Sequence, residues 1–468
     1  MAVNLLWFRR DLRLEDNHAL AYCTSQPIGF VPLFILDPDI LDRQGLSQRR
    51  IDFLLQSLDR LKGLFAEQKK IFHILYGKPV SVFRELCRQN TIAAICMNRD
   101  YEPYASRRDA DVEEMGTQIG VAVLVFKDSI LHEPQEITKE NGDPYQVFTP
   151  YYRQWLRLEK EPPFSSGLWR SLTPFSIPSG LQPDSKYRVF PSPVKEISPE
   201  KQMDTFFKDK IQQYDTDRDI PSIEGTSRLS PYLRFGLVSV RTLYAKSMDV
   251  ARDLPLEQRF RIESFIRQLA WRDFYVQIMY RFPYVENGAF QKKYDAIVWE
   301  NNPEWFDAWK KGRTGFPLVD AGMRQLNAEG WMHNRLRMIT ASFLTKDLLI
   351  DWRWGAEYFQ SQLLDHDLAL NNGGWQWAAS TGTDAQPWFR IFNPYEQSKK
   401  FDPEGNYIRK YIPELKNMDP ALLHQPPKTV GGSKNRKSER LPADYPDPIV
   451  THAERRLLAL ETYKRIGS

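Results

Sequence analysis

The chain has 468 residues, 42% of them hydrophobic, so it can bury a sizeable core and holds two or three folding units. Its 64 Lys and Arg against 60 Asp and Glu permit a polyanionic partner without requiring one. The apolar runs are too short to cross a bilayer and the amino terminus lacks a secretory signal, so we expect a cytoplasmic protein with no membrane contact. Cys23, Cys87 and Cys96 lack metal-ligand spacing, so no bound metal is expected.

Residues 2–126 alternate short apolar runs with longer helical patterns. The runs are VNLLWF, IGFVPLFIL, IFHILY, IAAICM and VAVLVF. Strands separated by helices predict an α/β layer with a doubly wound parallel sheet. Ligands of such sheets bind outside the carboxyl ends of the strands, so the loops after Arg9, Leu36 and Asn98 are the expected binding loops. The layer has no GxGxxG and no GxxxxGK[ST], which argues against standard dinucleotide or nucleoside triphosphate binding.

A proline-rich stretch of little periodicity follows, from about Pro134 to Pro199, and it is typical of a connector. Beyond it the patterns are almost wholly helical. We therefore predict an α/β domain over residues 1–130, a connector over 131–204 and an all-α domain over 205–468.

Two helical segments of the last part carry polar and aromatic side chains beside an apolar stripe. From Ile262 to Tyr280 the stripe should face a core, and in the segment after Gly330 an apolar face should likewise turn inward. The first stripe is Ile262, Phe265, Ile266, Leu269 and Val276, and the second is Leu336, Ile339 and Phe343. The adjoining faces could line a cavity, and they carry Gln268, Trp271, Arg272 and Tyr275 in the first segment and Asn334, Arg337 and Met338 in the second.

The segment GTSRLS, residues 225–230, predicts the start of a helix. Hydroxyls at Thr226 and Ser227 and free backbone amides would suit a phosphate group. The alternative is a helix start that these hydroxyls simply cap.

The segment DHDLALNNGGWQW, residues 365–377, combines carboxylates, carboxamides, glycines and indoles. It predicts a site for a large aromatic ligand with polar edges, in which Asp365 and Asp367 form hydrogen bonds and Asn371 or Asn372 meets a ring heteroatom. The alternative is a helix end whose tryptophans only fill the core. Arg337 is long enough to pair with Asp365, either around a flat heterocycle or as an ordinary interhelical ion pair.

Tryptophans recur through the helical part, and those at 299, 352 and 375 could relay single electrons or could simply pack in the core. We find no Ser/His/Asp or Cys/His arrangement for nucleophilic catalysis. Any chemistry must therefore be carried by a cofactor.

Motifs along nearly the whole chain together resemble one family. They include LLWFRRDLRLEDNHAL, YQVFTPYYRQW, EGTSRLS, LAWRDFY, NNGGWQWAASTGTDAQPWFRIFNP and FDPEGNYIRKYIPEL. The chain resembles the photolyase/cryptochrome family, and within it the class I cyclobutane pyrimidine dimer photolyases. The resemblance implies a monomer, nucleoid-associated if bacterial, in which excited reduced FAD (FADH⁻) donates an electron to a flipped-out dimer in UV-damaged single- or double-stranded DNA. The alternative is a cryptochrome-type blue-light photoreceptor that binds FAD without repair.

The resemblance also implies roles for individual residues. Asn371 would face the reactive ring nitrogen of the flavin, and Trp375, Trp352 and Trp299 would carry electrons from the surface. The expected FAD contacts are Tyr214, Thr226, Ser227, Arg228, Leu229, Ser230, Arg337, Asp365, His366, Asp367 and Asn371. The expected dimer contacts are Gln268, Trp271, Asn334, Met338 and Trp377, and the expected strand contacts are Arg218, Arg272, Gln397 and Lys399.

The chain departs from the family pattern in three places. Class I enzymes usually carry glutamate at the position of Gln268, so slower repair is implied, and the family commonly has glycine at His366. The asparagine and glutamate of folate-binding members are replaced by Tyr104 and Ala105. We therefore expect 8-hydroxydeazaflavin in preference to methenyltetrahydrofolate as the second, antenna chromophore. Its expected contacts are Asp100, Glu102, Tyr104 and Arg108.

Overall fold

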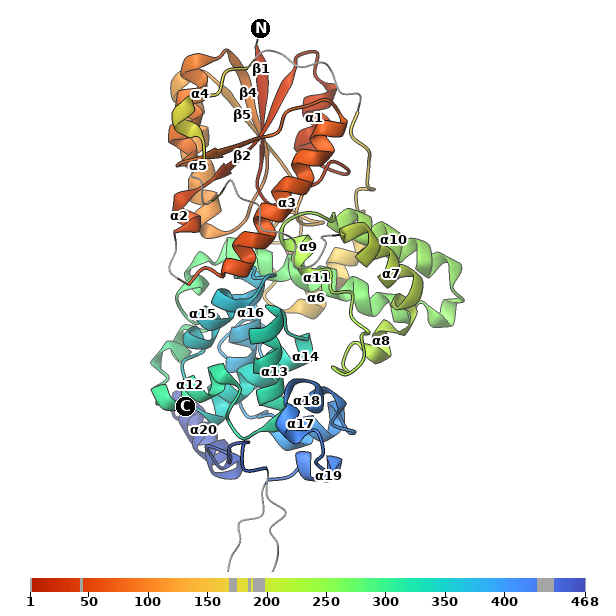
Figure 1. Cartoon of the computed structure of the whole chain (residues 1–468), viewed down its shortest axis with the longest axis vertical. Helices are drawn as coiled ribbons and strands as arrows, with labels where there is room; N and C mark the ends of the chain where they lie inside the picture. The colour runs from red at the N-terminus through yellow and green to blue at the C-terminus, as the bar shows by residue number, and fades with distance from the viewer. Residues whose placement is uncertain are drawn as a thin grey trace, which may run out of the picture. The chain divides into compact units, whose positions relative to one another are not determined.

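The computed structural model describes residues 2–42, 45–167, 175–183, 187, 198–426 and 442–467. The chain forms two compact units (Figure 1). The first is Met1–Gln212 with Ser227–Pro283, and the second is Gln213–Thr226 with Tyr284–Ser468. Residues 227–283 therefore pack with the α/β layer. The domain limits predicted at residues 130 and 204 rest on composition and periodicity, whereas the two units are defined by contacts between residues. These limits stay a prediction.

The first unit contains a five-stranded sheet in its described part, with strand order β3-β2-β1-β4-β5. Every pair of neighbouring strands is parallel, which confirms the predicted doubly wound sheet. The strands are β1 (Val3–Phe8), β2 (Phe30–Leu36), β3 (His73–Tyr76), β4 (Ile92–Asn98) and β5 (Ala122–Phe126).

Helices cover both faces of this sheet (Figure 1). Since successive side chains of a strand point to opposite faces, β1 supplies two cores. Leu6 and Phe8 pack with α1 (His18–Ser25) and α3 (Gln48–Glu67). Leu5 and Trp7 pack with α4 (Pro79–Gln89) and α5 (Pro103–Ile119). Both faces of the sheet are thus buried, which explains why its strands are almost continuously apolar.

The other helices of the first unit lie before, within and after the stretch predicted as a connector, which itself contains α6 and the start of α7. The apolar stripe predicted between Ile262 and Val276 is buried, as expected. These helices are α2 (Pro38–Leu41), α6 (Phe148–Arg157), α7 (Pro199–Asp209), α9 (Ser230–Arg234), α10 (Val240–Asp253) and α11 (Phe260–Arg281).

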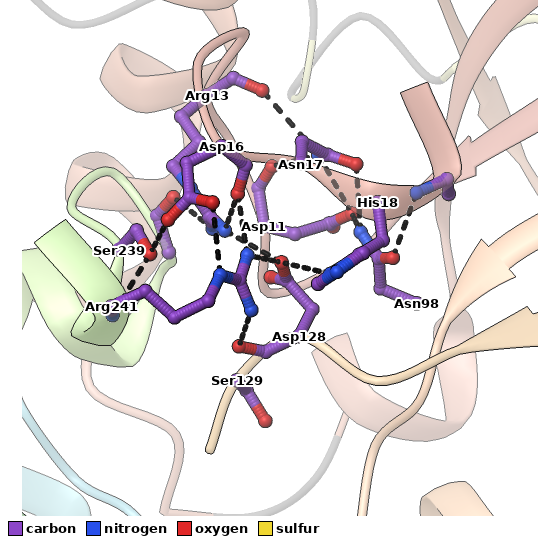
Figure 2. A network of polar contacts seen from close by, with 12 residues as sticks. Asp11, Arg13, Asp16, Asn17, His18, Asn98, Asp128, Ser129, Ser239 and Arg241 are labelled. Carbon is purple, nitrogen blue, oxygen red and sulfur yellow. Dashed lines mark hydrogen bonds and ion pairs between the residues drawn. The ribbon is translucent and has the colours of Figure 1, made fainter. Parts of the chain in front are cut away.

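A network of buried charges joins α10 to the loop after β1 (Figure 2). Nε of Arg241 donates to Oδ1 of Asp16 at 2.9 Å, and its Nη2 donates to Oδ1 of Asp128 at 2.8 Å. Nη2 of Arg13 donates to the same Asp128 oxygen at 2.6 Å. Burial alone would raise the pKa of the Asp128 carboxyl, but Arg13, His18 and Arg241 outweigh it and the net pKa is lowered. Asp128 is therefore charged in the interior, and it relies on these partners.

The second unit is helical in its described residues, as predicted. Its core is formed largely by α13, α14, α15 and α16, and the stripe predicted at Leu336, Ile339 and Phe343 lies in it. No helix in the described ranges is long and apolar enough to span a membrane. The helices are α8 (Tyr214–Asp217), α12 (Pro303–Lys311), α13 (Pro317–Glu329), α14 (Asn334–Ser342), a π-helix (Phe343–Asp347), α15 (Trp352–Gln362), α16 (Leu368–Ala379), α17 (Pro394–Phe401), α18 (Asn406–Tyr411), α19 (Pro420–Leu423) and α20 (His452–Gly467).

Candidate functional site

The predicted pair of Arg337 and Asp365 is present in the second unit. Nη2 of Arg337, on α14, lies 2.8 Å from Oδ2 of Asp365, and Nε of Arg337 donates to the Met332 carbonyl at 2.9 Å. Only 3% of the Asp365 side chain is exposed, and its Oδ1 has no hydrogen-bond partner among the described residues. A buried carboxylate oxygen without a donor is costly unless a ligand supplies one. This orphan acceptor beside a guanidinium fits a polar ligand with a hydroxyl or N–H to offer.

The side chains that follow Asp365 fix the start of α16. Oδ1 of Asp367 accepts from the backbone amides of Ala369 and Leu370 at 3.1 and 3.2 Å, so this carboxylate is the N-cap of the helix. His366, between the two carboxylates, is also buried. The capping bonds give Asp367 a structural role that sequence reasoning missed, and the role predicted for it toward a ligand stays a prediction.

The two neighbouring asparagines of α16 have different surroundings. Nδ2 of Asn372 donates to the Val285 carbonyl at 2.7 Å, and Asn372 is buried. Nδ2 of Asn371 donates to the Ala356 carbonyl of α15 at 3.0 Å, and Asn371 is half-buried. The bond to α15 fixes the amide plane of Asn371 without burying it fully. Of the two asparagines, Asn371 is thus the better candidate for a ring heteroatom.

The three predicted electron carriers share one core cluster in the second unit. Trp375 and Trp352 are buried in it, and Trp299 packs against it while remaining partly exposed. The Trp375 ring meets Phe359 edge to face at 4.9 Å between centroids, and Trp299 meets Tyr463 in the same way at 6.5 Å. The core-packing alternative therefore describes what these indoles do in the fold, and electron transfer would be an additional role.

A glycine of α15 makes room for one of these indoles. A Cβ at Gly355 would overlap with Cη2 of Trp375. We expect Gly355→Ala to displace that ring and to lower the free energy of unfolding by about 1–3 kcal/mol, measured by urea denaturation. Gly63 lies on the exposed side of α3, and a Cβ added there has no atom within 4 Å. Gly63→Ala should therefore raise the free energy of unfolding by about 0.5–1 kcal/mol. Equal effects of the two substitutions would show that the indole does not need this space.

The GTSRLS segment begins a helix, but not as the capping alternative predicted. Helix α9 begins at Ser230 with Leu229 as its N-cap and no side-chain cap bond. The Ser227 hydroxyl accepts from the Leu229 amide at 3.3 Å, and Arg228 has a left-handed φ of 50°. Because α9 has only five residues, its start alone is no anion site. Thr226 belongs to the second unit, and Ser227 onward to the first.

Tyr214, the other residue predicted for the phosphate region, is buried on α8. Burial raises the pKa of its phenol to about 12, against the opposing effect of Arg218, so the phenol is neutral. The Arg218 guanidinium lies 5.9 Å from the centre of the Tyr214 ring, and Arg218 is half-buried.

Helix α11 carries Gln268, Trp271 and Tyr275, which are all half-buried, and the cavity that this face could line stays a prediction. Arg272 differs, because it is buried and its guanidinium donates to the Ser129 carbonyl. This position holds α11 to the segment after β5. The structure therefore gives no support to a phosphate contact by Arg272, and we leave it out of the proposed DNA contacts.

The remaining predicted DNA contacts lie in the second unit. Nδ2 of Asn334 lies 3.9 Å from the Met338 sulfur, one turn further along α14. Trp377 is half-buried and tilted against Phe392. On α17, Lys399 is exposed and Gln397 is half-buried, so both side chains are accessible.

The four predicted antenna residues lie at the carboxyl edge of the sheet, after β4. Nη1 of Arg10 lies 3.1 Å from Asp100 and 3.0 Å from Glu102, and the Tyr104 hydroxyl donates to Asp37 at 2.6 Å. Burial alone would raise the pKa of Asp100, but Arg10, Arg108, Arg9 and Arg234 lower it to about 2. Asp100 is thus charged, and each of the four residues is paired with a protein partner, including Arg108 with Asp109 at 2.8 Å.

Comparisons with known proteins cover both ends of the chain. Residues 4–166 match DNA photolyase, and residues 265–465 match the FAD binding domain of DNA photolyase. The deoxyribodipyrimidine photo-lyase of Alkalihalophilus pseudofirmus is 38% identical, over 99% of this chain and 98% of its own. That of Salmonella typhimurium is 39% identical over 99% of both chains. The chain belongs to the DNA photolyase family. The residues that match the FAD binding domain include Arg337, Asp365 and Asn371. Oδ1 of Asp365, which has no hydrogen-bond partner among the described residues, fits a bound flavin nucleotide.

Solved structures agree with this membership. A class III photolyase from Agrobacterium tumefaciens is 30% identical, with a TM-score of 0.89 over 100% of this chain and 98% of its own. An archaeal photolyase from Sulfolobus tokodaii, described with two FAD molecules, is 32% identical, with a TM-score of 0.85 over 99% and 100%. A cryptochrome from Synechocystis is 27% identical, with a TM-score of 0.88 over 99% of both. The fold is therefore shared by a class III photolyase, by an archaeal photolyase and by a cryptochrome.

Proposed function

We propose that the chain uses light to split cyclobutane pyrimidine dimers in DNA. It is a deoxyribodipyrimidine photo-lyase, because it is similar to enzymes of that name along 99% of its length. That full-length similarity carries the proposal. We further propose that it works as a monomer in the cytoplasm, where its damaged DNA substrate lies if the organism is bacterial.

The helical part would hold FAD through charged and polar side chains. When bound in its reduced anionic form, FAD supplies the electron that opens the dimer under light and takes that electron back. Arg337 would place positive charge beside this anion while Asp365 offers its unpaired oxygen to a hydroxyl. Asn371, its amide plane fixed by the Ala356 carbonyl, would face the reactive ring nitrogen. Tyr214, residues 226–230, His366 and Asp367 complete the proposed FAD contacts, and Trp375, Trp352 and Trp299 the proposed path for electrons from the surface.

The proposed contacts of the dimer rest on the resemblance, residue by residue. Trp271 and Trp377 are each assigned to stacking on a pyrimidine, and Gln268 to a hydrogen bond with a base carbonyl. An amide donates a hydrogen bond but supplies no proton, so we propose slower repair than with the usual glutamate. Asn334 and Met338 are likewise assigned to contacts with the dimer. Arg218, Gln397 and Lys399 are assigned to the DNA strand, so binding should weaken with salt.

Stacking on Trp377 can be tested by binding in the dark. We expect Trp377→Ala to weaken binding of a dimer-containing oligonucleotide by about 1–3 kcal/mol, measured by fluorescence anisotropy. The same oligonucleotide without the dimer should bind as before. Trp305→Ala, which removes another half-buried indole of the second unit, serves as the matched control. Unchanged affinity for the damaged strand would remove Trp377 from the dimer site.

For the second chromophore we propose 8-hydroxydeazaflavin over methenyltetrahydrofolate, bound near Asp100, Glu102, Tyr104 and Arg108. The support is the segment EPY, Glu102–Tyr104, which resembles the deazaflavin-binding members of the family and follows β4 at the carboxyl edge of the sheet. Because the Sulfolobus tokodaii photolyase is described with two FAD molecules, a second FAD is a third possible result for the identity of this chromophore. Absorption of the purified protein, with mass spectrometry of the released chromophores, identifies which one is bound.

Within the family we propose class I, on the resemblance of Trp271, Asn334, Met338 and Trp377. The alternative is a photoreceptor, which the similarity to the Synechocystis cryptochrome favours. Illumination of the flavin-reduced protein with dimer-containing and (6-4)-containing oligonucleotides separates these outcomes. Loss of the dimer alone supports the proposal, loss of the (6-4) product overturns the lesion assignment, and no loss supports the photoreceptor.

A further inference from the structure

One side chain outside the predicted site lies flat against Trp271. The ring of Phe148, the first residue of α6, is 3.7 Å from the Trp271 ring between centroids, and the two planes differ by 7°. Phe148 is 2% exposed, whereas Trp271 is half-buried. The benzene ring therefore covers one face of an indole that remains partly accessible.

Phe148 also contacts a row of further side chains on α6 and α11. Tyr152, one turn further along α6, stacks on Phe148 at 5.6 Å and 13°. The Arg267 guanidinium, one turn before Trp271 on α11, lies 5.6 Å from the Phe148 ring and 5.0 Å from the Tyr152 ring. The Tyr152 hydroxyl in turn donates to Glu263 at 3.3 Å. Phe148 and Tyr152, four apart on α6, thus pack against Arg267 and Trp271, four apart on α11. Phe148 cannot move without disturbing these contacts.

The other aromatic neighbours of Trp271 lie at different angles. In the described part of the chain, Phe274 meets it edge to face at 83° and Tyr275 is tilted by 32°. Neither lies parallel to the indole, so Phe148 is what sets the plane of the ring. A base can then stack only on the face that Phe148 leaves.

We propose that Phe148 is a positioning residue, which fixes the plane of Trp271 and leaves a single indole face for a pyrimidine of the dimer. This inference rests on the proposed function of Trp271 as a stacking platform. Without the benzene ring the indole gains rotamer freedom, which it loses again when DNA binds. The ordering cost of one such side chain corresponds to roughly 2- to 10-fold in affinity.

The test compares Phe148→Leu with the wild-type full-length holoenzyme. We expect binding of a dimer-containing oligonucleotide in the dark to weaken by about 2- to 10-fold, and binding of the undamaged oligonucleotide to stay the same. In the light, KM should rise while kcat at saturating DNA stays unchanged, because a merely structural defect would not separate the two. Phe148→Tyr keeps the ring and should restore the affinity.

A matched control separates this effect from lost stability. Phe65 is buried in the sheet layer and stacks on Phe72 at 5.3 Å and 20°. Phe65→Leu should therefore lose stability without losing preference for the damaged strand. If Phe148→Leu does not fold, Phe148→Met takes its place, because a flexible unbranched side chain fills such a gap with less strain.

Trp271→Ala separates failure of this inference from failure of the proposed function. If Trp271→Ala binds the damaged strand as the wild type does, Trp271 is no platform and the proposed function of that residue fails with the inference. If Trp271→Ala weakens binding and neither Phe148→Leu nor Phe148→Met does, the inference about Phe148 alone is overturned.

Discussion

Replacement of Asp365 by alanine is expected to deprive the protein of most of its flavin. The carboxylate pairs with Arg337 at 2.8 Å and keeps a second oxygen buried without a donor, so both of its oxygens serve the proposed FAD site. A hydrogen bond to a charged group contributes about 1.5–3 kcal/mol, which corresponds to at least a tenfold loss of flavin affinity. The ratio of flavin to protein absorbance after purification, and titration with added FAD, measure this loss.

Asp419→Ala is the control for that substitution. Asp419 belongs to the same unit and caps α19 through the Ala421 amide at 2.8 Å, so its removal also costs a helix cap. The flavin content of Asp419→Ala should stay at the wild-type value. If Asp365→Ala also kept its flavin at wild-type affinity, the Arg337–Asp365 pair would be only an interhelical ion pair.

Arg241→Met is expected to cause the largest loss of stability, about 3–5 kcal/mol, measured by urea unfolding at neutral pH. Arg241 is 1% exposed and donates to both Asp16 and Asp128, which the substitution would leave buried with fewer partners. Arg252→Met, on the same helix, breaks an exposed pair with Asp249 and should change stability by less than about 0.5 kcal/mol.

The effect of Arg241→Met should depend on pH. The folded-state pKa of Asp128 is lowered, so its charged form stabilises the wild type above the ordinary carboxyl pKa of 3.8, and this stability is lost as pH falls through the folded pKa. The variant lacks part of that stabilisation from the start. The difference in free energy of unfolding between wild type and variant should therefore become smaller as the pH falls below about 4. If this difference in free energy of unfolding stayed constant with pH, lost packing and not lost charge would explain why Arg241→Met is less stable.

Features set by local patterns could be predicted from the sequence. The strands follow from short apolar runs, and the buried stripes of α11 and α14 from helical spacing. The Arg337–Asp365 pair followed from the reach of one side chain and the chemistry of the other. Each of these depends on neighbours in the chain or on one simple pairing.

Features set by contacts distant in the chain could not be predicted. Arg272 lies at the border between two faces of α11, and only the position of Ser129, 143 residues earlier, shows that it turns inward. Phe148 meets Trp271 across a similar separation, and nothing within its own motif, YQVFTPYYRQW, indicates that contact. The capping role of Asp367 is different, because it could have been predicted from the local sequence: an aspartate directly before an apolar helical run is a common N-cap.

The central claim, that a flavin held at Arg337, Asp365 and Asn371 drives repair, is tested most directly by counting dimers split in the light. The purified, flavin-reduced protein would be illuminated with dimer-containing oligonucleotide, beside a dark sample and a sample of Asp365→Ala. We predict that thymines are restored only in the light, and in proportion to the flavin that each protein retains. Dimers that persist under illumination in the flavin-loaded wild-type protein would contradict the account.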